Sequence, residues 1–302
     1  MYKYLFYLSV TVLCLWVSSL QAQGFSFAGC DYSQGIVFVM ENDELVWQHP
    51  AKETNDIWVL ENGNILFTTG RGVLEMTRQN DTVFHYQSES PIFACQRLKN
   101  NGNTFIGECR SGRLLEVAPD GKIVKEVSIL PEGTADAGFP FMRNARRLDN
   151  GNYLVAHYGG QTVKEYDPAG KVVWSADVSG GPHSVIRLSN GNTLVAVADI
   201  TRDPRIVELD KEGNVVWQFS NRDIEGAPLK FLGGMHLLPD GNLLFANWVG
   251  HEKEPDKRVH LLMINKEKEV VYTLKDHPAL QTMSSVYCTG YKERVTKENS
   301  FH

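Results

Sequence analysis

One short pattern recurs along this chain and constrains its fold more than any other feature. It consists of a leucine, one or two further residues, an Asn-Gly or Asp-Gly pair and a second asparagine, and an apolar stretch follows it each time. The copies are Leu60–Asn64, Leu98–Asn103, Leu148–Asn152, Leu188–Asn192 and Leu238–Asn242. Asn-Gly and Asp-Gly supply the positive φ that a tight hairpin requires. Each copy therefore predicts a β-hairpin whose second strand is apolar.

A second hairpin follows each of these, and its last strand is also repeated. The copies cover residues 45–50, 82–87, 123–128, 172–177, 215–220 and 270–275. Their third position is Trp47, Phe84, Lys125, Trp174, Trp217 and Tyr272, which is aromatic in five of the six copies. An aromatic residue at a fixed place in an outer strand is expected to pack between adjacent sheets. We interpret these side chains as structural rather than ligand-binding.

Repeats of about 40–50 residues with four strands each are typical of a β-propeller. The turn pattern occurs five times and the last strand six times, and this difference is informative. The segment 25–50 supplies three strands and the segment 284–295 supplies one, so the two chain ends are expected to share a blade. Such closure removes the free sheet edges. We predict an all-β, six-bladed propeller with four antiparallel strands per blade, formed as one domain by residues 24–294.

The first 22 residues have a different character. Lys3 precedes an apolar run over residues 4–17, and small residues lead to Ala22. This is the form of a secretory signal peptide, and the run is shorter than the roughly 20 residues of a spanning helix. We expect cleavage and a periplasmic or secreted protein; an uncleaved anchor and a lipidated cysteine are the alternatives. Residues 295–302 are expected to form a loose tail.

Four cysteines follow the predicted signal peptide, and their even number fits two disulfides in an oxidising compartment. Cys30 and Cys288 hold comparable places in the blade shared by the chain ends, so a bridge between them would clamp the termini. Cys95 and Cys109 flank one hairpin turn and could pair across it. Buried free thiols are the alternative.

The repeats resemble a known group of proteins. Asp167–Trp174 and Asp210–Trp217 are similar to the repeats of PQQ-like propellers, and the hairpins beside them resemble the propeller of bacterial arylsulfotransferases. The chain as a whole resembles the small exported PQQ-like propellers common in gut Bacteroidetes. The arylsulfotransferase resemblance implies six blades and a histidine nucleophile in the channel, assisted by His, Arg and Asn. Beside the predicted propeller, this sequence is too short to include the extra domain of those enzymes.

Quinoprotein alcohol dehydrogenases have eight blades and an adjacent Cys-Cys pair, neither of which this chain has. We therefore predict no cofactor and do not expect PQQ. No spaced metal-ligand motif occurs, so no metal is predicted, although three histidines from different blades could hold a divalent ion.

A site is expected at the channel mouth, on the face that carries the long connections 128–143, 199–205, 220–235 and 248–258. Loops carry function on such scaffolds. The candidate catalytic residues are His183, His236, His157 and Arg143, and the candidate ligand-binding residues are Arg71, Arg110, Asn144, Tyr158, Asn247 and Trp248. Histidine can act as base, acid or nucleophile, and arginine binds carboxylates and sulfates with paired hydrogen bonds. Each of these residues could equally be structural.

These residues predict a site for an anionic or saccharide ligand, used in glycan recognition or processing. If the protein is an enzyme, a histidine would act as base or nucleophile and arginines would stabilise negative charge, as in lyase or sulfate-transfer chemistry. A non-catalytic scaffold that binds another protein is the alternative, followed by a PQQ or metal redox protein. The net charge of -6 argues against a nucleic-acid partner, and we expect a monomer.

Overall fold

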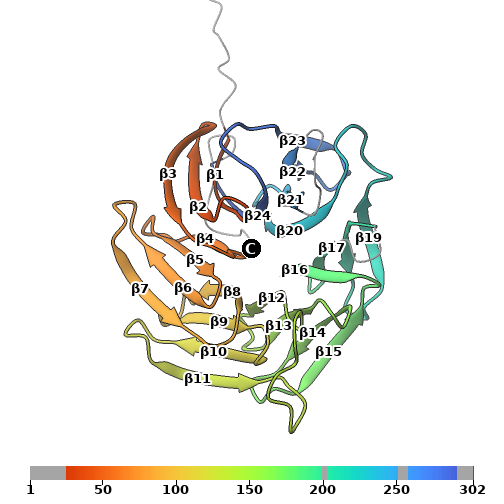
Figure 1. The fold of residues 1–302 in the computed structure, drawn as a ribbon. Helices are drawn as coiled ribbons and strands as arrows, with labels where there is room; N and C mark the ends of the chain where they lie inside the picture. The colour runs from red at the N-terminus through yellow and green to blue at the C-terminus, as the bar shows by residue number, and fades with distance from the viewer. Residues whose placement is uncertain (1–24, 199–202, 251–257, 291–301) are drawn as a thin grey trace, which may run out of the picture.

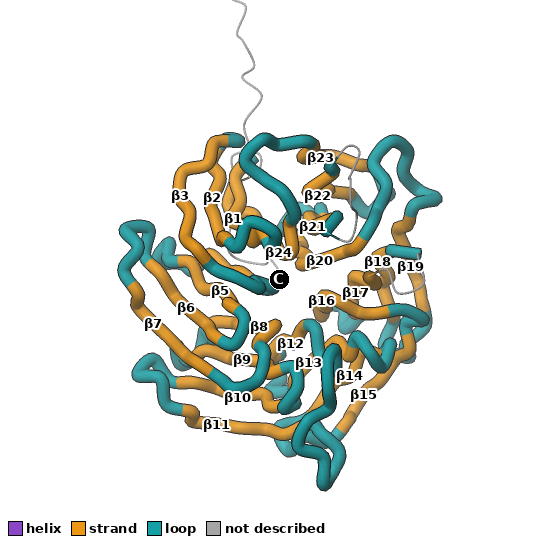
Figure 2. The backbone as a smooth tube through the Cα atoms, viewed as in Figure 1, coloured by secondary structure: helices purple, strands orange, loops and turns teal. Residues whose placement is uncertain are grey.

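The computed structural model describes residues 25–198, 203–250, 258–290 and 302. Their strands form six four-stranded antiparallel sheets, arranged as blades around a central axis (Figure 1). Figure 2 shows that the described chain consists of strands and loops. The predicted six-bladed β-propeller is confirmed. Within the described residues, no helix has the length and hydropathy needed to cross a membrane.

We name the blades A to F by their strand order from the axis outward. Blade A contains β24 (Met283–Gly290), β1 (Ser26–Asp31), β2 (Ile36–Glu41) and β3 (Glu44–Pro50), and blade B contains β4 (Ile57–Val59), β5 (Ile65–Thr69), β6 (Gly72–Met76) and β7 (Thr82–Gln87). Blade C contains β8 (Ile92–Arg97), β9 (Thr104–Glu108), β10 (Arg113–Val117) and β11 (Ile123–Ser128), and blade D contains β12 (Asn144–Arg147), β13 (Tyr153–His157), β14 (Thr162–Tyr166) and β15 (Val172–Asp177). Blade E contains β16 (Gly181–Arg187), β17 (Thr193–Ala198), β18 (Arg205–Leu209) and β19 (Val215–Ser220), and blade F contains β20 (Phe231–Leu237), β21 (Leu243–Trp248), β22 (Val259–Ile264) and β23 (Val270–Lys275).

Blade A is assembled from both ends of the chain, as predicted. Strand β24 pairs antiparallel with β1, and Ala28 lies opposite Tyr287. The predicted signal peptide, residues 1–22, lies outside the described residues. The expected tail, residues 295–302, also lies outside them except for its last residue, His302, which is buried.

The repeated turn does more than reverse the chain. In blade D, Gly151 adopts a φ of 97°, and the Asn152 side chain donates a hydrogen bond of 2.6 Å to Glu165 on β14. The same carboxylate accepts a hydrogen bond of 2.6 Å from Arg187 of blade E. Equivalent contacts join Asn64, Glu75 and Arg97, and join Asn192, Glu208 and Lys266. The second asparagine of the pattern therefore helps to connect neighbouring blades.

The outer strands share a β-bulge that explains the recurring aromatic residue. In blade D, Glu165 pairs with Trp174 and Tyr166 pairs with Val172, so Val173 has no partner across the ladder. The valines left over in this way are Val46, Val83, Val124, Val173, Val216 and Val271. The following residue packs toward the next blade, where Trp174 donates a hydrogen bond of 2.7 Å to the Lys211 carbonyl. The predicted packing between sheets is therefore observed.

The predicted disulfides are wrong. Cys30, Cys95, Cys109 and Cys288 are free and buried. Cys30 lies opposite Ser285, whereas Cys288 lies opposite Phe27, so these two cysteines are offset along the strand pair. Cys95 lies opposite Ile106, and Cys109 follows the end of β9. Comparable positions in the repeat do not bring the sulfurs face to face, and the alternative of buried thiols holds.

Candidate functional site

The innermost strands contain β-bulges near their N-terminal ends, at the mouth of the channel. In blade E, Pro182 pairs with Val197 and Ser184 pairs with Ala196, which leaves His183 without a ladder partner. A similar irregularity leaves Phe93 in blade C, Gly233 in blade F and Ser284 in blade A without a ladder partner. A bulge turns a side chain away from the alternating pattern of a strand. Here it directs one residue of each of these four blades toward the axis.

Blades B and D contribute Asn55 and Arg143 at the corresponding place, five residues before the leucine of their turn pattern. The six residues Asn55, Phe93, Arg143, His183, Gly233 and Ser284 line one cavity of about 280 Å³. We call this cavity the mouth pocket; its other walls are Tyr32, Glu53, Pro91, Phe139, Phe231 and Trp248. Each blade therefore contributes one side chain or glycine to a shared ring.

The glycines before His236 allow two blades to approach closely. A Cβ at Gly233 would collide with the backbone oxygen of Ser284, and a Cβ at Gly234 would collide with the side chain of Ser285. This glycine pair therefore permits a close backbone approach between blades F and A.

Arg143 is held by aromatic rings rather than by a carboxylate. Its guanidinium carbon lies 4.8 Å from the ring centre of Phe93, 4.7 Å from that of Phe139 and 5.2 Å from that of Tyr158. Burial lowers the pKa of Arg143. Among the described residues Arg143 forms no ion pair, and its buried Nε has no hydrogen-bond partner. The cation therefore keeps its donors for another group.

His183 lies on the same wall. Its ring packs edge-on against Phe231, with ring centres 5.2 Å apart. Burial and the positive charge of Arg143 lower the pKa of His183 to about 3. Its buried Nδ1 has no hydrogen-bond partner within the described part of the chain. His183 is therefore a neutral imidazole beside a cation.

An aromatic surface completes the pocket. Phe231 and Trp248 meet edge-to-face at 5.2 Å, and Tyr32 meets Trp248 in the same way at 5.7 Å. Tyr158 lies 6.2 Å from Phe231. Planar ring faces of this kind suit a sugar or aryl ring. Arg143, His183, Tyr158 and Trp248, all predicted as site residues, are thus brought together.

Other predicted residues are held by structural contacts. The Nε2 atom of His157 lies 2.8 Å from the Tyr166 hydroxyl, and burial lowers its pKa to about 4. The Asn247 side chain accepts a hydrogen bond from the Lys230 amide and donates to the carbonyls of Pro228 and Val259. It therefore fixes the loop before β20. Asn144 follows Arg143 and is buried, but its Oδ1 has no hydrogen-bond partner among the described residues.

His236 lies in the channel but not at the mouth pocket. Its Nδ1 accepts a hydrogen bond of 2.9 Å from the amide of Cys288, and its ring lies 4.3 Å from that of Tyr287. Burial and the nearby His302 lower the pKa of His236. Of the four candidate catalytic residues, Arg143 and His183 share the mouth pocket, whereas His157 and His236 each lie in a different environment. In the described part of the chain, no three His, Cys, Asp or Glu side chains are grouped to hold a metal ion.

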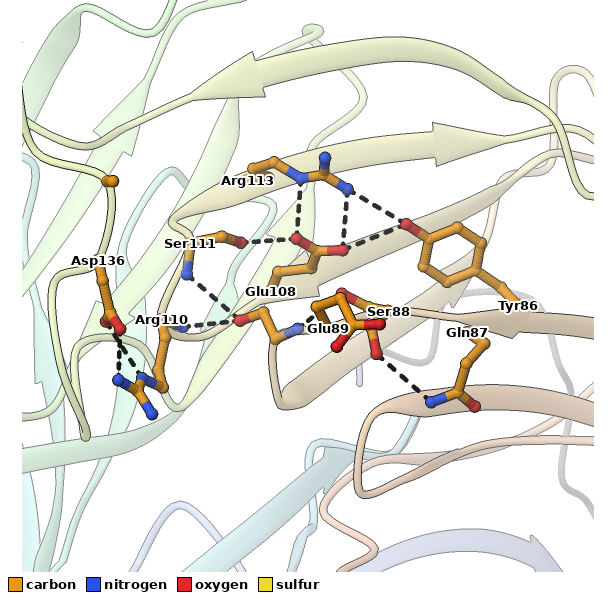
Figure 3. A pocket seen from close by; sticks show the side chains of 11 residues that line it. Tyr86, Gln87, Ser88, Glu89, Glu108, Arg110, Ser111, Arg113 and Asp136 are labelled. Carbon is orange, nitrogen blue, oxygen red and sulfur yellow. Dashed lines mark hydrogen bonds and ion pairs between the residues drawn. The ribbon is translucent and has the colours of Figure 1, made fainter.

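A second, larger cavity of about 520 Å³ lies between blades B and C (Figure 3). Arg110 forms an ion pair with Asp136 there, and Glu108 accepts hydrogen bonds from Arg113, Ser111 and Tyr86. Its charged groups are thus paired with one another. Arg71 is exposed and lies 3.6 Å from Glu89. The predicted residues Arg71 and Arg110 do not reach the mouth pocket.

An ion pair deeper in the channel was not predicted. Arg146 donates two hydrogen bonds to Asp56, of 2.7 Å from Nη1 and 3.0 Å from Nη2. Asn55, which lines the mouth pocket, directly precedes Asp56.

The ring residues Asn55, Phe93, Gly233 and Ser284 were also missed. The spacing of five residues before each turn leucine could have identified the first three, because it selects Arg143 and His183 as well, but no such turn follows Ser284. Nothing comparable marks Asp56 and Arg146, whose contact joins blades that are not neighbours.

Comparisons with known proteins agree with the fold and with part of the sequence. The arylsulfotransferase family model matches residues 119–224, a range that includes Arg143, His157 and His183. A protein of unknown function from Bacteroides caccae is 25% identical, with a TM-score of 0.76 over 87% of this chain and 98% of the other. No curated protein matches.

Two lyases share the fold alone. A streptogramin B lyase is 9% identical, with a TM-score of 0.56 over 82% of this chain and 78% of its own. The virginiamycin B lyase of Staphylococcus aureus is 11% identical, with a TM-score of 0.53 over 83% of this chain and 84% of its own. The chain is thus a six-bladed β-propeller with an arylsulfotransferase-like segment, similar over most of its length to a Bacteroides propeller.

Proposed function

We propose that the mouth pocket binds a ligand that carries an anionic group and a planar or saccharide ring, as in an acidic glycan or an aryl anion. The observation that carries this proposal is Arg143, a cation enclosed by three aromatic rings without a carboxylate partner among the described residues. A half-buried guanidinium without a counter-ion is costly. A carboxylate or sulfate would supply the missing partner through paired hydrogen bonds.

The remaining walls suit such a ligand. Tyr32, Phe231 and Trp248 offer apolar ring surface, and Asn55 offers a polar group. The exposed Glu53 also borders the pocket and could accept a sugar hydroxyl. The cavity of about 280 Å³ lies near the lower end of the range for ligand pockets. A cavity of this size fits one ring with its substituents better than it fits the surface of a protein partner.

His183 gives the pocket a possible catalytic group. A neutral imidazole has a free lone pair, which a base or a nucleophile needs. The charge of Arg143 contributes to the low pKa of His183, so an anion bound at Arg143 would raise that pKa toward the useful range. Lyase and sulfate-transfer chemistry both fit this pair, with Arg143 stabilising the negative charge. We place this activity outside the cytoplasm, because residues 1–22 have the form of a signal peptide.

The test is a binding and turnover screen. Wild type, Arg143→Met and His183→Asn are titrated with acidic oligosaccharides and aryl sulfates by calorimetry, and each mixture is assayed for cleavage or sulfate release. We expect Arg143→Met to lose at least about tenfold in affinity, since one charge-assisted contact is worth about 1.5–3 kcal/mol. For an enzyme, His183→Asn should bind but not turn over.

The matched control is Arg71→Met, which removes an exposed arginine outside the pocket. Equal affinity of Arg143→Met and Arg71→Met for every bound anion would contradict the proposal. Binding without turnover by wild type would indicate recognition rather than catalysis. Failure of all small anions, together with capture of a folded protein partner through this face, would favour the scaffold alternative.

A further inference from the structure

The last residue of the sequence lies inside the propeller. His302 is buried, and the chain end sits at the axis of the ring (Figure 1). Its ring packs edge-on against Trp58 at 4.6 Å and against Tyr287 at 5.3 Å, and it lies 5.5 Å from His236. Three inner strands, β4, β20 and β24, therefore contact one imidazole.

Two polar atoms of His302 have hydrogen-bond partners, and a third lies near a carboxylate. Arg146 Nε donates a hydrogen bond of 2.7 Å to its backbone oxygen. Its Nδ1 lies 2.8 Å from the carbonyl oxygen of Met235, and its Nε2 lies 3.3 Å from Asp56 Oδ1. Asp56 and Arg146 have side chains only 1% and 5% exposed. The backbone oxygen and Nδ1 thus have hydrogen-bond partners, whereas Nε2 lies near the Asp56 carboxylate without a hydrogen bond within the described part of the chain.

The contact with Met235 determines which ring nitrogen carries a hydrogen. A carbonyl oxygen only accepts, so Nδ1 must carry a hydrogen to bond Met235. The Asp56 carboxylate also only accepts, so the contact at Nε2 is attractive when that nitrogen carries a hydrogen too. Arg146 faces the backbone oxygen rather than the ring nitrogens, and His236 and Tyr287 face the ring from the side.

We propose that the channel between Asp56, Arg146 and Met235 is a binding site for an imidazole with an adjoining carbonyl, and that His302 is its internal ligand. This site is separate from the anion site proposed at Arg143. The two are linked through the backbone, because Asn55 lines the mouth pocket and Asp56 contacts His302. His302 therefore fills the channel beneath the mouth pocket and ties blades B, D and F together.

The experiment replaces the ligand in the full-length chain. The thermal midpoint of His302→Ala is measured with increasing imidazole, in parallel with wild type and with His85→Ala, a matched control at an exposed histidine on β7. We expect His302→Ala to unfold at a lower temperature and imidazole to raise its midpoint saturably, since a ligand of the native state stabilises it. Wild type and His85→Ala should not respond.

Two further arms separate a site from a general effect. N-methylimidazole lacks one N–H and should raise the midpoint less than imidazole. In the double variant His302→Ala with Asp56→Asn, imidazole should lose its effect, whereas adding Arg143→Met to His302→Ala should leave it intact. The last arm keeps failure of the anion site distinct from failure of this one.

The proposal is overturned if imidazole shifts all variants equally, or shifts none of them. If His302→Ala does not fold, its refolding yield is measured with and without imidazole, and His302→Gln replaces it in the melting experiment. A yield that does not respond to imidazole, with a His302→Gln midpoint equal to that of wild type, would overturn it as well.

Discussion

Asp56 and Arg146 form a buried two-point ion pair between blades B and D, with N–O distances of 2.7 and 3.0 Å. Asp56 also accepts a hydrogen bond of 3.0 Å from the amide of Cys95 in blade C. One carboxylate thus joins three blades at the axis.

Asp56→Asn should be strongly destabilising. It leaves the Arg146 guanidinium buried without a counter-charge, and breaking a buried pair in this way costs about 3–5 kcal/mol. The measurement is the free energy of unfolding in urea. Asp120→Asn is the control, because its partner Lys122 and Asp120 itself are exposed and no change is expected there. Equal free energies for the two variants would contradict the role of Asp56.

Stability should fall on the acid side of neutrality. Burial holds the pKa of His183 at about 3 and that of His157 at about 4, whereas an unfolded histidine has a pKa of about 6.5. Below about pH 6.5 the unfolded chain binds protons that the native state excludes, and the loss continues until the folded pKa is reached. Over this range each histidine lowers the free energy of unfolding by about 1.4 kcal/mol per pH unit.

This prediction is checked by urea unfolding at about pH 7.5, 6 and 5. His157→Asn should lose part of the slope between the last two values. A free energy of unfolding that stays constant across this range would show that these histidines become protonated in the native state.

The interblade contact at Glu165 should contribute measurably to the free energy of unfolding. Arg187→Met removes its hydrogen bond to Glu165 and to the Gly191 carbonyl, and leaves the carboxylate with its asparagine partners alone. We expect a loss of about 1–3 kcal/mol, as for a buried hydrogen bond to a charged group. Lys122→Met, at an exposed pair, should leave the urea midpoint unchanged. Identical midpoints for both variants would show that the contact is dispensable.

The thiols should be inert in the folded protein. Burial raises the pKa of Cys30, Cys95, Cys109 and Cys288, which suppresses the reactive thiolate. A thiol reagent should therefore label these four residues only after unfolding, and a reducing agent should not lower the thermal midpoint. A midpoint that drops on reduction would restore the disulfide prediction.

The architecture could be predicted because its signals are local. The Asn-Gly turns and the valine followed by an aromatic residue each define a hairpin within a few residues, and their repetition gives the blade count. The state of the cysteines could not be predicted in this way, because pairing of Cys30 with Cys288 depends on strand register. Register places Ser285 opposite Cys30 instead.

The candidate site could be predicted only in part. Arg143 was found because it lies where a long loop enters an inner strand, and His183 because it lies at the corresponding place in the next blade. His157 was expected beside them, but it ends the second strand of its blade and turns to Tyr166. Asp56 and Arg146 are 90 residues apart and belong to blades that are not adjacent, so no periodic pattern reports their contact.

The shared blade also dictates how the molecule can assemble. Strand β1 finds its inner neighbour only in β24, so a growing chain carries an unpaired strand edge until residue 290 has been made. Such edges pair readily with other strands, and contacts between distant parts of a chain form slowly. The ring therefore closes last at blade A. An exchange of β24 between two copies is the misassembly that this topology favours.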